Sequence, residues 1–507
     1  MSKKRRVGWF GLGAVFLTVL ACSLSNPTPA AWVLTPTAEA AAAAATVAAK
    51  TRAAISNPIL TDPAETPTIT AQPSQTPLAN TLKPLGPWLV YPAEEGRALI
   101  IRNADSSGHT RLPLPDPLLD AGDLTNGLAP QGGWLAVRTG RRQGWGDLAI
   151  QLIHLPDGSQ QRLTPLLSTA LEKDDLSIQS VVWRDSLRWS PDGHYLAFIA
   201  ATDGTSSDLY VYDMLAKKIQ RLTTGSYQAA TPFWSPDSQW VITQEMSAIT
   251  GSDPIGWKLE EVWAVNLLTQ EFRKLYDPSP DSNGEIFMGW TDPQKMLFYS
   301  HSTGGWHDLR QIDLDKLKVT TLLAGSFNQI AFDPVSKTIA FTRKEGPPLP
   351  TGASPGLYQV PAYGGVPELA QAGDWPRLTW SGLVKTFIAS GPQGTLVLPP
   401  GGKPVLYEGE PTGLPSPNNK WMACWGGDGS GSHAGLRLYQ PGGQILQAIL
   451  TDPVQDFTWA PDSTGLFALS NGRLYHFTFP DLKPAILEDG IHAPYPGGMG
   501  WISAEHH

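Results

Sequence analysis

Few residues of this chain stand at spacings that catalysis requires. The nearest approach to a nucleophile loop is Gly427-Asp428-Gly429-Ser430-Gly431, with His433 close downstream, but an extra glycine separates the Asp from the Ser. A flexible loop explains this run better than a catalytic site. No G-x-S-x-G elbow occurs in the chain. We therefore predict no catalytic residues, no hydrolase domain and no enzymatic activity.

Two further stretches carry metal-ligand types. Residues 277–285 are rich in Asp, Ser and Asn, but Gly284 comes one residue too early for a calcium loop and no Glu follows at the twelfth place. His301 and His307 flank a Gly-Gly-Trp run without a third ligand nearby. A turn-rich connection and surface histidines are the simpler interpretations. We predict no metal and no cofactor.

The N-terminus has the pattern of an export signal. Lys3 to Arg6 are basic, and Val7 to Ala21 form 15 apolar residues, fewer than the roughly 20 of a membrane-spanning helix. The stretch ends in Val19-Leu20-Ala21-Cys22, which resembles the lipobox of bacterial lipoproteins. The resemblance implies cleavage of residues 1–21, a lipid on Cys22 and a location outside the cytoplasm. An uncleaved signal anchor is the alternative.

Composition separates a tether from a folded part. Residues 22–86 are rich in Pro, Thr and Ala without apolar periodicity, so we expect a mostly disordered tether. The whole chain contains 50 Gly and 46 Pro, and only 16% of its residues are charged, against about 25% in typical proteins. This favours a turn-rich, all-β fold. The net charge of −9 becomes −13 beyond the basic N-terminus, which disfavours nucleic acid as a partner. The second cysteine, Cys424, lies in an apolar run and should be a buried, inert thiol.

One sequence pattern recurs about every 45 residues: an aromatic residue, then Ser-Pro-Asp or a relative, then a short gap and an apolar strand. The fullest copy runs from Trp189 to Phe198. Further copies begin at Trp234, Trp290 and Trp459, with weaker ones at Leu128, Phe332, Trp380 and Pro415. Proline presets the dihedral angle of a type I turn, so each tetrapeptide is a hairpin corner. Two more strand signals follow each corner, which gives four-stranded blades stacked around an axis.

The Trp-Ser-Pro-Asp-Gly corner resembles the TolB-like, WD40-like propeller repeat known as PD40, over about residues 87–502. The resemblance implies a single closed β-propeller over residues 87–507, and we predict eight blades, with nine as the alternative. It also implies structural roles for the repeated aromatic and acidic residues, namely Trp189, Asp192, Trp234, Asp237, Trp290, Trp380, Trp459, Asp462 and Trp501.

The ends of the repeat region predict how the ring closes. The first unit starts at Trp88, in the second strand of a blade, and its missing first strand is echoed by Gly498-Met499-Gly500-Trp501 at the other terminus. We expect this C-terminal strand to complete the first blade and to remove an exposed sheet edge.

The sequence supports three general hypotheses about function. TolB-like propellers typically bind envelope proteins, so the resemblance implies a non-enzymatic binding or scaffolding role at the cell envelope, with the membrane contacted only through the lipid anchor. One alternative is a propeller lyase or glycosidase that uses channel acids and a metal. Another is a cell-wall glycan binder, with rim aromatics as its platform. The candidate rim residues stand beside glycines or polar loops: Trp145, Trp257, Trp306 and Trp425.

Overall fold

The computed structural model describes residues 82–83 and 86–502, apart from residues 184, 249–256, 279–283, 303–304, 344–347, 350–351, 400–401, 409–412, 426–434, 441–444, 480 and 492–498. The predicted signal segment and tether, with Cys22, lie outside these residues. Among the residues described, no helix is long and apolar enough to cross a membrane.

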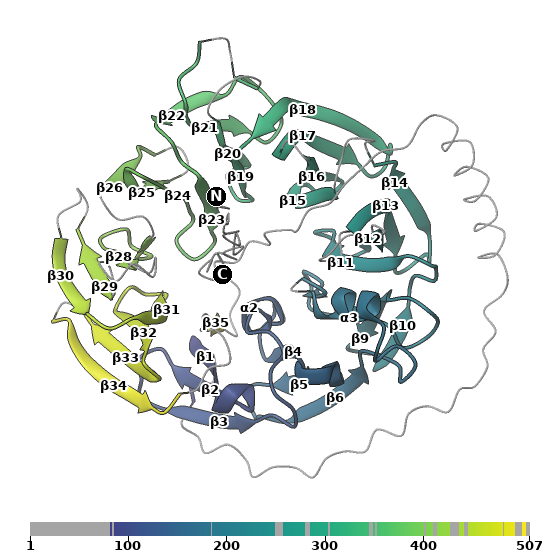
Figure 1. Ribbon diagram of the computed structural model, residues 1–507, viewed down its shortest axis with the longest axis horizontal. Coiled ribbons are helices and arrows are strands. Elements are labelled where there is room, and N and C mark those ends of the chain that lie inside the picture. The colour runs from purple at the N-terminus through teal and green to yellow at the C-terminus, as the bar shows by residue number, and fades with distance from the viewer. Residues whose placement is uncertain are drawn as a thin grey trace, which may run out of the picture.

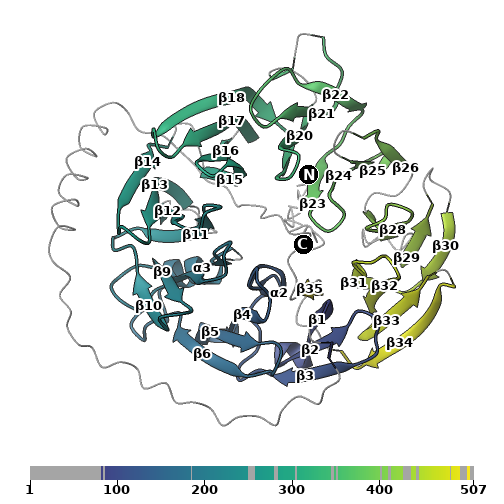
Figure 2. The same ribbon diagram turned by 180° about the vertical axis from the view of Figure 1, so that it is seen from behind.

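Nine antiparallel sheets form a closed ring around a central channel (Figure 1), and the view from behind shows the same nine blades (Figure 2). We number the blades along the chain. From the rim inward, blade 1 contains β3(His109–Pro113), β2(Ala98–Asn103), β1(Trp88–Ala93) and β35(Gly500–Ile502). Blade 2 contains β6(Gln160–Pro165), β5(Gly146–His154) and β4(Trp134–Arg141), and blade 3 contains β10(Lys218–Arg221), β9(Asp208–Asp213), β8(Tyr195–Ala200) and β7(Leu187–Trp189).

The next three blades are regular four-stranded sheets. Blade 4 contains β14(Phe272–Tyr276), β13(Trp257–Asn266), β12(Trp240–Ala248) and β11(Gln228–Trp234). Blade 5 contains β18(Lys318–Phe327), β17(Gly305–Asp313), β16(Lys295–Ser302) and β15(Gly284–Asp292). Blade 6 contains β22(Glu368–Ala372), β21(Gly356–Pro361), β20(Thr338–Arg343) and β19(Gln329–Asp333).

The last three blades repeat the same order. Blade 7 contains β26(Val405–Glu408), β25(Gly394–Leu398), β24(Thr386–Gly391) and β23(Arg377–Ser381). Blade 8 contains β30(Ile445–Leu450), β29(Leu436–Tyr439), β28(Met422–Trp425) and β27(Gly413–Pro415), and blade 9 contains β34(Lys483–Asp489), β33(Arg473–Thr478), β32(Gly465–Ser470) and β31(Val454–Trp459). The 3-10 helices η1(Glu94–Gly96) and η2(Gln143–Trp145) and the helices α2(Asp123–Asn126) and α3(Asp175–Val182) lie in connections.

The predicted closed propeller is confirmed, and the number of blades is nine. Eight sheets have four strands, and blade 2 has three, because its inner position is held only by a single bridge between Leu128 and Leu135. The unit at Trp380, one of the weaker copies in the sequence, forms a complete sheet.

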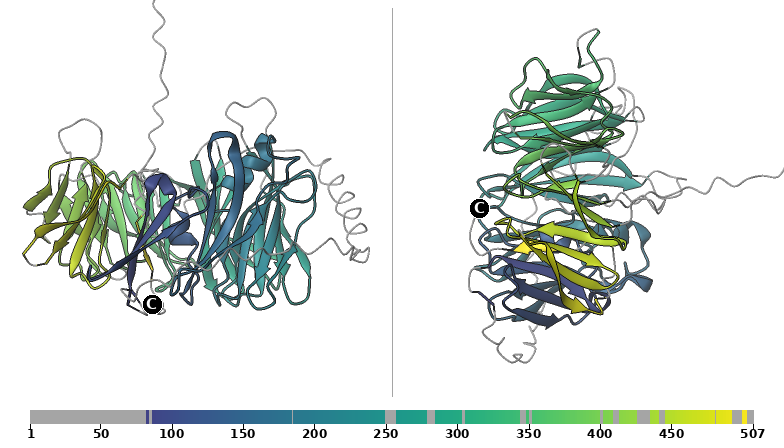
Figure 3. Two further views of the ribbon diagram at one scale, coloured as in Figure 1. Left: turned by 90° about the horizontal axis from the view of Figure 1, so that it is seen from below. Right: turned by 90° about the vertical axis from the view of Figure 1, so that its left-hand side faces the viewer.

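The strands run between two faces of the disc, as the edge-on views show (Figure 3). We call one the corner face, because it carries the turns between the first and second strands of each blade and between the third and fourth. The other, the loop face, carries the connections between blades, including α2 and α3, and the loops between second and third strands. Both helices lie against the channel (Figure 1).

The ring is closed by β35, which pairs antiparallel with β1. Trp88 is in register with Ile502, and Leu89 with Trp501. The same segment bonds to blade 9, since the Met499 N–H donates to Asp456 (3.0 Å) and the Trp501 indole donates to the Thr458 hydroxyl (2.9 Å). The C-terminal strand thus joins the last blade to the first.

The Ser-Pro-Asp corners are fixed by their own side chains. The Ser190 hydroxyl donates to Asp192 (2.6 Å) and accepts the Tyr195 N–H (2.9 Å), and Asp192 also accepts the His194 N–H (3.1 Å). Asp237 and Asp462 accept the backbone N–H groups of Gln239 (3.1 Å) and Thr464 (3.0 Å) in the same way. These acids shape turns and are engaged locally.

The repeated tryptophans connect neighbouring blades. Each donates its indole N–H to a backbone carbonyl of the preceding blade or of the segment that leads into it: Trp189 to Gly127 (2.7 Å), Trp234 to Arg188 (3.0 Å) and Trp459 to Leu414 (2.8 Å). Trp290 and Trp380 are buried as well, at 8% and 3% exposure. Among the residues that the structure describes, the Trp290 indole N–H has no hydrogen-bond partner, and its ring stacks on Phe233 of blade 4 instead.

This difference predicts unequal effects of the same substitution. Trp459→Phe leaves the buried Leu414 carbonyl without its donor, whereas Trp290→Phe removes a donor that is already unpaired. Trp459→Phe should therefore lower the free energy of unfolding by about 1–3 kcal/mol more than Trp290→Phe. Urea unfolding of the two variants and the wild type measures this. Equal losses would show that the indole hydrogen bond contributes nothing to holding the blades together.

Candidate functional site

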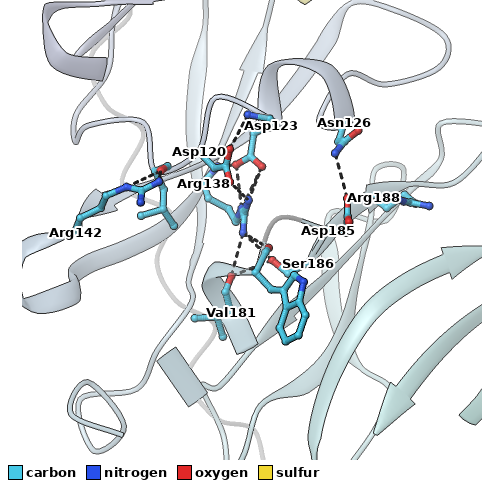
Figure 4. A network of polar contacts seen from close by, with 12 residues as sticks. Asp120, Asp123, Asn126, Arg138, Arg142, Val181, Asp185, Ser186 and Arg188 are labelled. Atoms are coloured by element: carbon cyan, nitrogen blue, oxygen red, sulfur yellow. Dashed lines mark hydrogen bonds and ion pairs between the residues drawn. The ribbon is translucent and has the colours of Figure 1, made fainter. Parts of the chain in front are cut away.

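A buried ion pair fixes the two helices on the loop face. Arg138 of β4 is 1% exposed, and its guanidinium binds Asp123 of α2 at 2.8 Å. On its other side it donates to the Ser186 hydroxyl (2.9 Å) and to the Val181 carbonyl at the end of α3 (3.3 Å). Figure 4 shows the arginine at the centre of these contacts. One side chain therefore ties α2, blade 2 and the start of blade 3 together.

The electrostatics of this pair are those of a structural contact. Burial alone would lower the pKa of Arg138, but the carboxylates of Asp123, Asp120 and Asp185 outweigh burial and raise it. The helix α3 is itself capped by Asp174, which accepts the Ser177 N–H (2.8 Å). The network holds the connections in place.

A second polar group, between blades 3 and 4 on the loop face, is not fully paired. We define the blade 3–4 carboxyl cluster as Asp208 at the start of β9, Glu245 near the end of β12, and Glu260 and Glu261 of β13. Glu245 stands directly opposite Glu261 in the sheet register. Three of the four acids have cationic partners: Asp208 binds Arg221 (2.5 Å), Glu260 binds Lys258 (2.8 Å) and Glu261 binds Lys274 (3.1 Å).

Glu245 is the exception. Among the described residues it has no hydrogen-bond or ion-pair partner. Burial, together with the charges of Glu261 and Asp208, raises its pKa to about 7. Burial also raises the pKa of Asp208 to about 6, although Arg221 opposes the change. A carboxyl group that titrates near neutral pH can exchange a proton or accept a cationic ligand.

Metal binding is not favoured at this cluster. Over the described part of the chain, no group of three or more His, Cys, Asp and Glu residues is arranged to hold a metal ion. His307 lies 3.2 Å from Asp308, and Asp277 of the calcium-like stretch pairs with Lys274 (2.8 Å). The side chain of His301 and residues 279–283 lie outside the described residues, as does the Gly427–Gly431 run with His433.

The candidate rim tryptophans do not form a platform in the residues described. Trp257 is 3% exposed and packs against Trp183 at 6.2 Å, so its ring is not available to a ligand. Trp145 is half-buried against the core of blades 2 and 3. Trp306 and Trp425 belong to β17 and β28, but their side chains lie outside the description. Cys424 is buried, as predicted.

Sequence reasoning did not find Glu245. It occupies one place in an otherwise ordinary strand, Val241-Ile242-Thr243-Gln244-Glu245-Met246. The only local signal is a charged residue at the end of an apolar strand. Whether its carboxyl group has a cationic partner depends on residues about 15 to 40 positions away in the sequence.

Comparisons with known proteins establish the fold and little else. No family model matches the chain. It is 38% identical to the uncharacterized peptidase YuxL of Bacillus subtilis (strain 168) over 55 residues, which are 11% of this chain and 8% of that relative. The chain thus spans a small fraction of the curated relative that it matches.

Similar solved structures are propellers of varied function. A eukaryotic initiation factor is 12% identical, with a TM-score of 0.50, over 83% of this chain and all of that one. TolB from Acinetobacter baumannii is 16% identical, with a TM-score of 0.31, over 56% and 63% of the two chains. Dipeptidyl peptidase 4 of Porphyromonas gingivalis is 10% identical, with a TM-score of 0.49, over 81% and 65%. TolB stands among these neighbours, as the repeat resemblance implies, and at such identities the likeness is one of fold.

The comparisons correct one expectation. The sequence predicts a protein that is not an enzyme, but the curated relative that matches the chain over 55 residues is a peptidase by name. The expectation rested on the lack of a matching nucleophile motif in the sequence, which does not exclude catalysis. We therefore withdraw the prediction that the protein is not an enzyme.

The raised pKa of Glu245 predicts a pH-dependent effect on stability. The folded pKa of about 7 lies above the ordinary 4.5, so the folded state favours the neutral acid, and this contribution to stability is lost as the pH rises through 7. Glu245→Gln should be more stable than the wild type at pH 8, by on the order of 1–3 kcal/mol, and equal to it near pH 4. Thermal melting across this range measures the effect. Glu260→Gln, which removes the partner of Lys258, is the control and should bring no gain at pH 8.

The buried ion pair of Arg138 and Asp123 predicts that the stability of the protein depends strongly on both residues. Asp123→Asn leaves Arg138 charged and removes its nearest counter-ion, with Asp120 remaining at 3.9 Å, and should lower the free energy of unfolding by about 3 kcal/mol. Removing both charges with Asp123→Leu and Arg138→Met should cost clearly less than the single change. Urea unfolding of the single and double variants gives the coupling. A double variant that loses the sum of the single losses would contradict the assignment.

Proposed function

We propose that this chain is a lipid-anchored β-propeller, located outside the cytoplasm, that binds a basic polypeptide through the blade 3–4 carboxyl cluster. The observation that carries the proposal is the state of Glu245, which is half-buried and, among the described residues, lacks the cationic partner that each of its neighbours has. A lysine or arginine of a partner supplies the missing cation.

The energetics favour such a ligand. In the free protein, burial holds Glu245 near half protonation at pH 7. A cation placed within ion-pair distance restores the charged carboxylate, and the return of the pKa toward its ordinary value corresponds to on the order of 1–3 kcal/mol of binding free energy. The excess of acidic residues beyond the N-terminus adds long-range attraction for basic partners.

The surroundings favour a polypeptide over a small ion. Tyr227 lies between blades 3 and 4, at the limit of exposure, and the charges of Glu260, Glu261 and Glu245 act on it and raise its pKa together with burial. An aromatic side chain beside a cluster of acids suits a peptide that carries cationic and apolar groups together. The anchoring part of the proposal is supported by the Val19-to-Cys22 motif and the apolar stretch before it.

A second candidate is the substrate-binding propeller of a peptidase. The relative that is a peptidase by name favours it. Under this candidate the basic polypeptide is a substrate and is cleaved. Incubation of a lysine-rich peptide with the purified protein, followed by mass spectrometry, distinguishes cleavage from binding.

Binding of defined peptides tests the proposal. A fluorescent oligolysine peptide should bind the wild type, an oligoglutamate peptide of equal length should not, and Glu245→Gln should weaken oligolysine binding about five- to tenfold, equivalent to about 1 kcal/mol or slightly more. Glu368→Gln, at an exposed position on the outer strand of blade 6, is the matched control and should bind like the wild type.

Proton release gives a second readout. Because the pKa of Glu245 is about 7, oligolysine binding at pH 7 should expel up to about half a proton. Calorimetry in two buffers with different ionisation enthalpies measures this quantity. Binding that is equal in Glu245→Gln and releases no proton would place the peptide elsewhere and refute the site.

A further inference from the structure

Exposed apolar side chains are concentrated in one sector of the ring. In the described part of the chain, ten large hydrophobic residues are well exposed, and nine of them fall between residues 215 and 369, in blades 3 to 6. The tenth, Ile486, lies in blade 9. Six of the nine occupy turns of the corner face, at 44% to 77% exposure: Leu215, Leu268, Leu317, Val335, Tyr363 and Val366.

Backbone hydrogen bonds place these turns together. Within each blade the two corner-face turns are joined: Met214 N–H donates to the His194 carbonyl (2.9 Å) in blade 3, and Leu267 N–H to Gln239 (3.0 Å) in blade 4. The same contact recurs between Leu314 and Gln294 in blade 5 (2.9 Å) and between Ala362 and Lys337 in blade 6 (2.8 Å).

Contacts between blades make the surface continuous. The Asp192 N–H of blade 3 donates to the Ser238 hydroxyl of blade 4 (3.0 Å), and Arg273 of blade 4 donates to the Leu314 carbonyl of blade 5 (3.2 Å). The Tyr363 hydroxyl of blade 6 donates to the Thr291 carbonyl of blade 5 (3.3 Å). We call this surface, formed by the turns that carry the six apolar residues, the apolar arc.

The fold does not need apolar residues at these places. In blade 3 the Asp213 carboxylate accepts the N–H groups of Leu215 and Ala216 (both 2.8 Å), and in blade 4 Asn266 accepts those of Leu268 and Thr269. The turns are therefore formed by Asp or Asn, and the leucine side chains project into solvent without a packing partner. Several such residues on one face indicate an interaction surface.

The rest of the chain joins the propeller at this same face. The N–H of Lys83 donates to Asn103 (2.9 Å), and its ammonium group binds Asp105 (2.6 Å) in the turn between β2 and β3. That turn is the corner-face turn of blade 1, next to the start of β1. The described chain thus begins at the corner face, and the apolar stretch and Cys22 precede this point in the sequence.

We propose that the apolar arc rests on the lipid bilayer, with Leu215, Leu268, Val335 and Val366 in the boundary between headgroups and acyl chains. The proposal rests on the proposed function for the lipid anchor and adds a second membrane contact to it. It turns the corner face to the membrane and the loop face, with the carboxyl cluster, away from it.

The charge of the arc defines the kind of membrane. The corner-face turns of blades 3 to 6 contain four acidic residues, Asp192, Asp237, Glu271 and Asp315, and three basic ones, Lys217, Lys316 and Lys337. The charges nearly cancel, with one acidic residue in excess, so attraction to anionic lipid contributes little and apolar insertion provides the contact. The contact should therefore form on zwitterionic lipid and persist in salt.

Site-specific labelling of the anchored full chain tests the proposal. An environment-sensitive fluorophore is placed on Leu215→Cys, on Val366→Cys and, as the control on another surface, on Ile486→Cys; Cys424 is buried and does not compete. On phosphatidylcholine vesicles the labels at 215 and 366 should shift to the blue and be quenched by lipid-borne quenchers, and the label at 486 should not. The shift should survive about 0.5 M NaCl.

A variant that lacks the apolar side chains of the arc is the matched control. Leu215→Glu, Leu268→Glu, Val335→Glu and Val366→Glu together should leave the melting temperature unchanged, since these side chains are exposed, and should abolish the blue shift of a label at Tyr363→Cys. Such a protein should still float with the vesicles through its anchor.

The outcomes separate the two proposals. A wild type that does not float with vesicles defeats the anchor and with it the proposed function. A protein that floats but shows no blue shift at 215 and 366 overturns the apolar arc alone. A blue shift that appears without vesicles and grows with protein concentration means that a second copy of the chain covers the arc, and overturns the bilayer contact.

Discussion

The hydrogen bond from an inner-strand indole to the backbone of the preceding blade is the contact on which the ring depends. A four-stranded sheet has two apolar faces and cannot bury both alone, so each blade needs two neighbours. The indoles of Trp189, Trp234 and Trp459 hold neighbouring inner strands in a fixed register. Trp501 makes the equivalent bond across the closing junction, to Thr458 of blade 9. One kind of contact therefore joins the blades at four junctions of the ring, and the C-terminal strand supplies the last of them, whereas Trp290 packs against blade 4 by ring stacking.

The sequence was sufficient for the propeller because this contact recurs in a visible pattern. Aromatic corners about 45 residues apart predict blades, and the echo of a corner at Gly498 to Trp501 predicts where the ring closes. The blade number was less certain for a physical reason. The copies at Leu128, Phe332, Trp380 and Pro415 depart from the full corner pattern, and the corner residues do not show which copy forms a complete sheet. The copy at Leu128 has a single bridge in place of an inner strand. Trp380 begins a weak copy in sequence but a full sheet in the structure, since pairing depends on backbone geometry more than on the corner residues.

The candidate site could not be predicted in the same way. Glu245 differs from Glu260 and Glu261 only in what surrounds it, and those surroundings come from the edge of blade 3 as well as from its own sheet. No spacing rule describes a carboxyl that lacks a partner, because the missing cation is a property of several strands. The apolar arc could be predicted from the sequence only in part. Each of its leucines is visible in sequence as a hydrophobic residue in a turn, but their common face becomes evident only once the turns are placed around the ring.

The alternation of strand direction assigns different chemistry to the two faces. The turns from the first to the second strand and from the third to the fourth strand of a blade are short, and in two of them Asp213 and Asn266 accept backbone N–H groups. The other side chains of these turns are not needed to form the turn, so they can be apolar. The connections that lead into blades 2 and 3 are much longer than these turns and must be fixed from within, which is the role of Arg138 and Asp123 around α2 and α3. A strand end beside such connections can retain a half-buried carboxyl such as Glu245, because the neighbouring segments keep water partly away from it. Since Lys83, at the start of the described chain, is bound at the corner face, the carboxyl cluster lies on the opposite face of the ring, which leaves that face to the proposed partner.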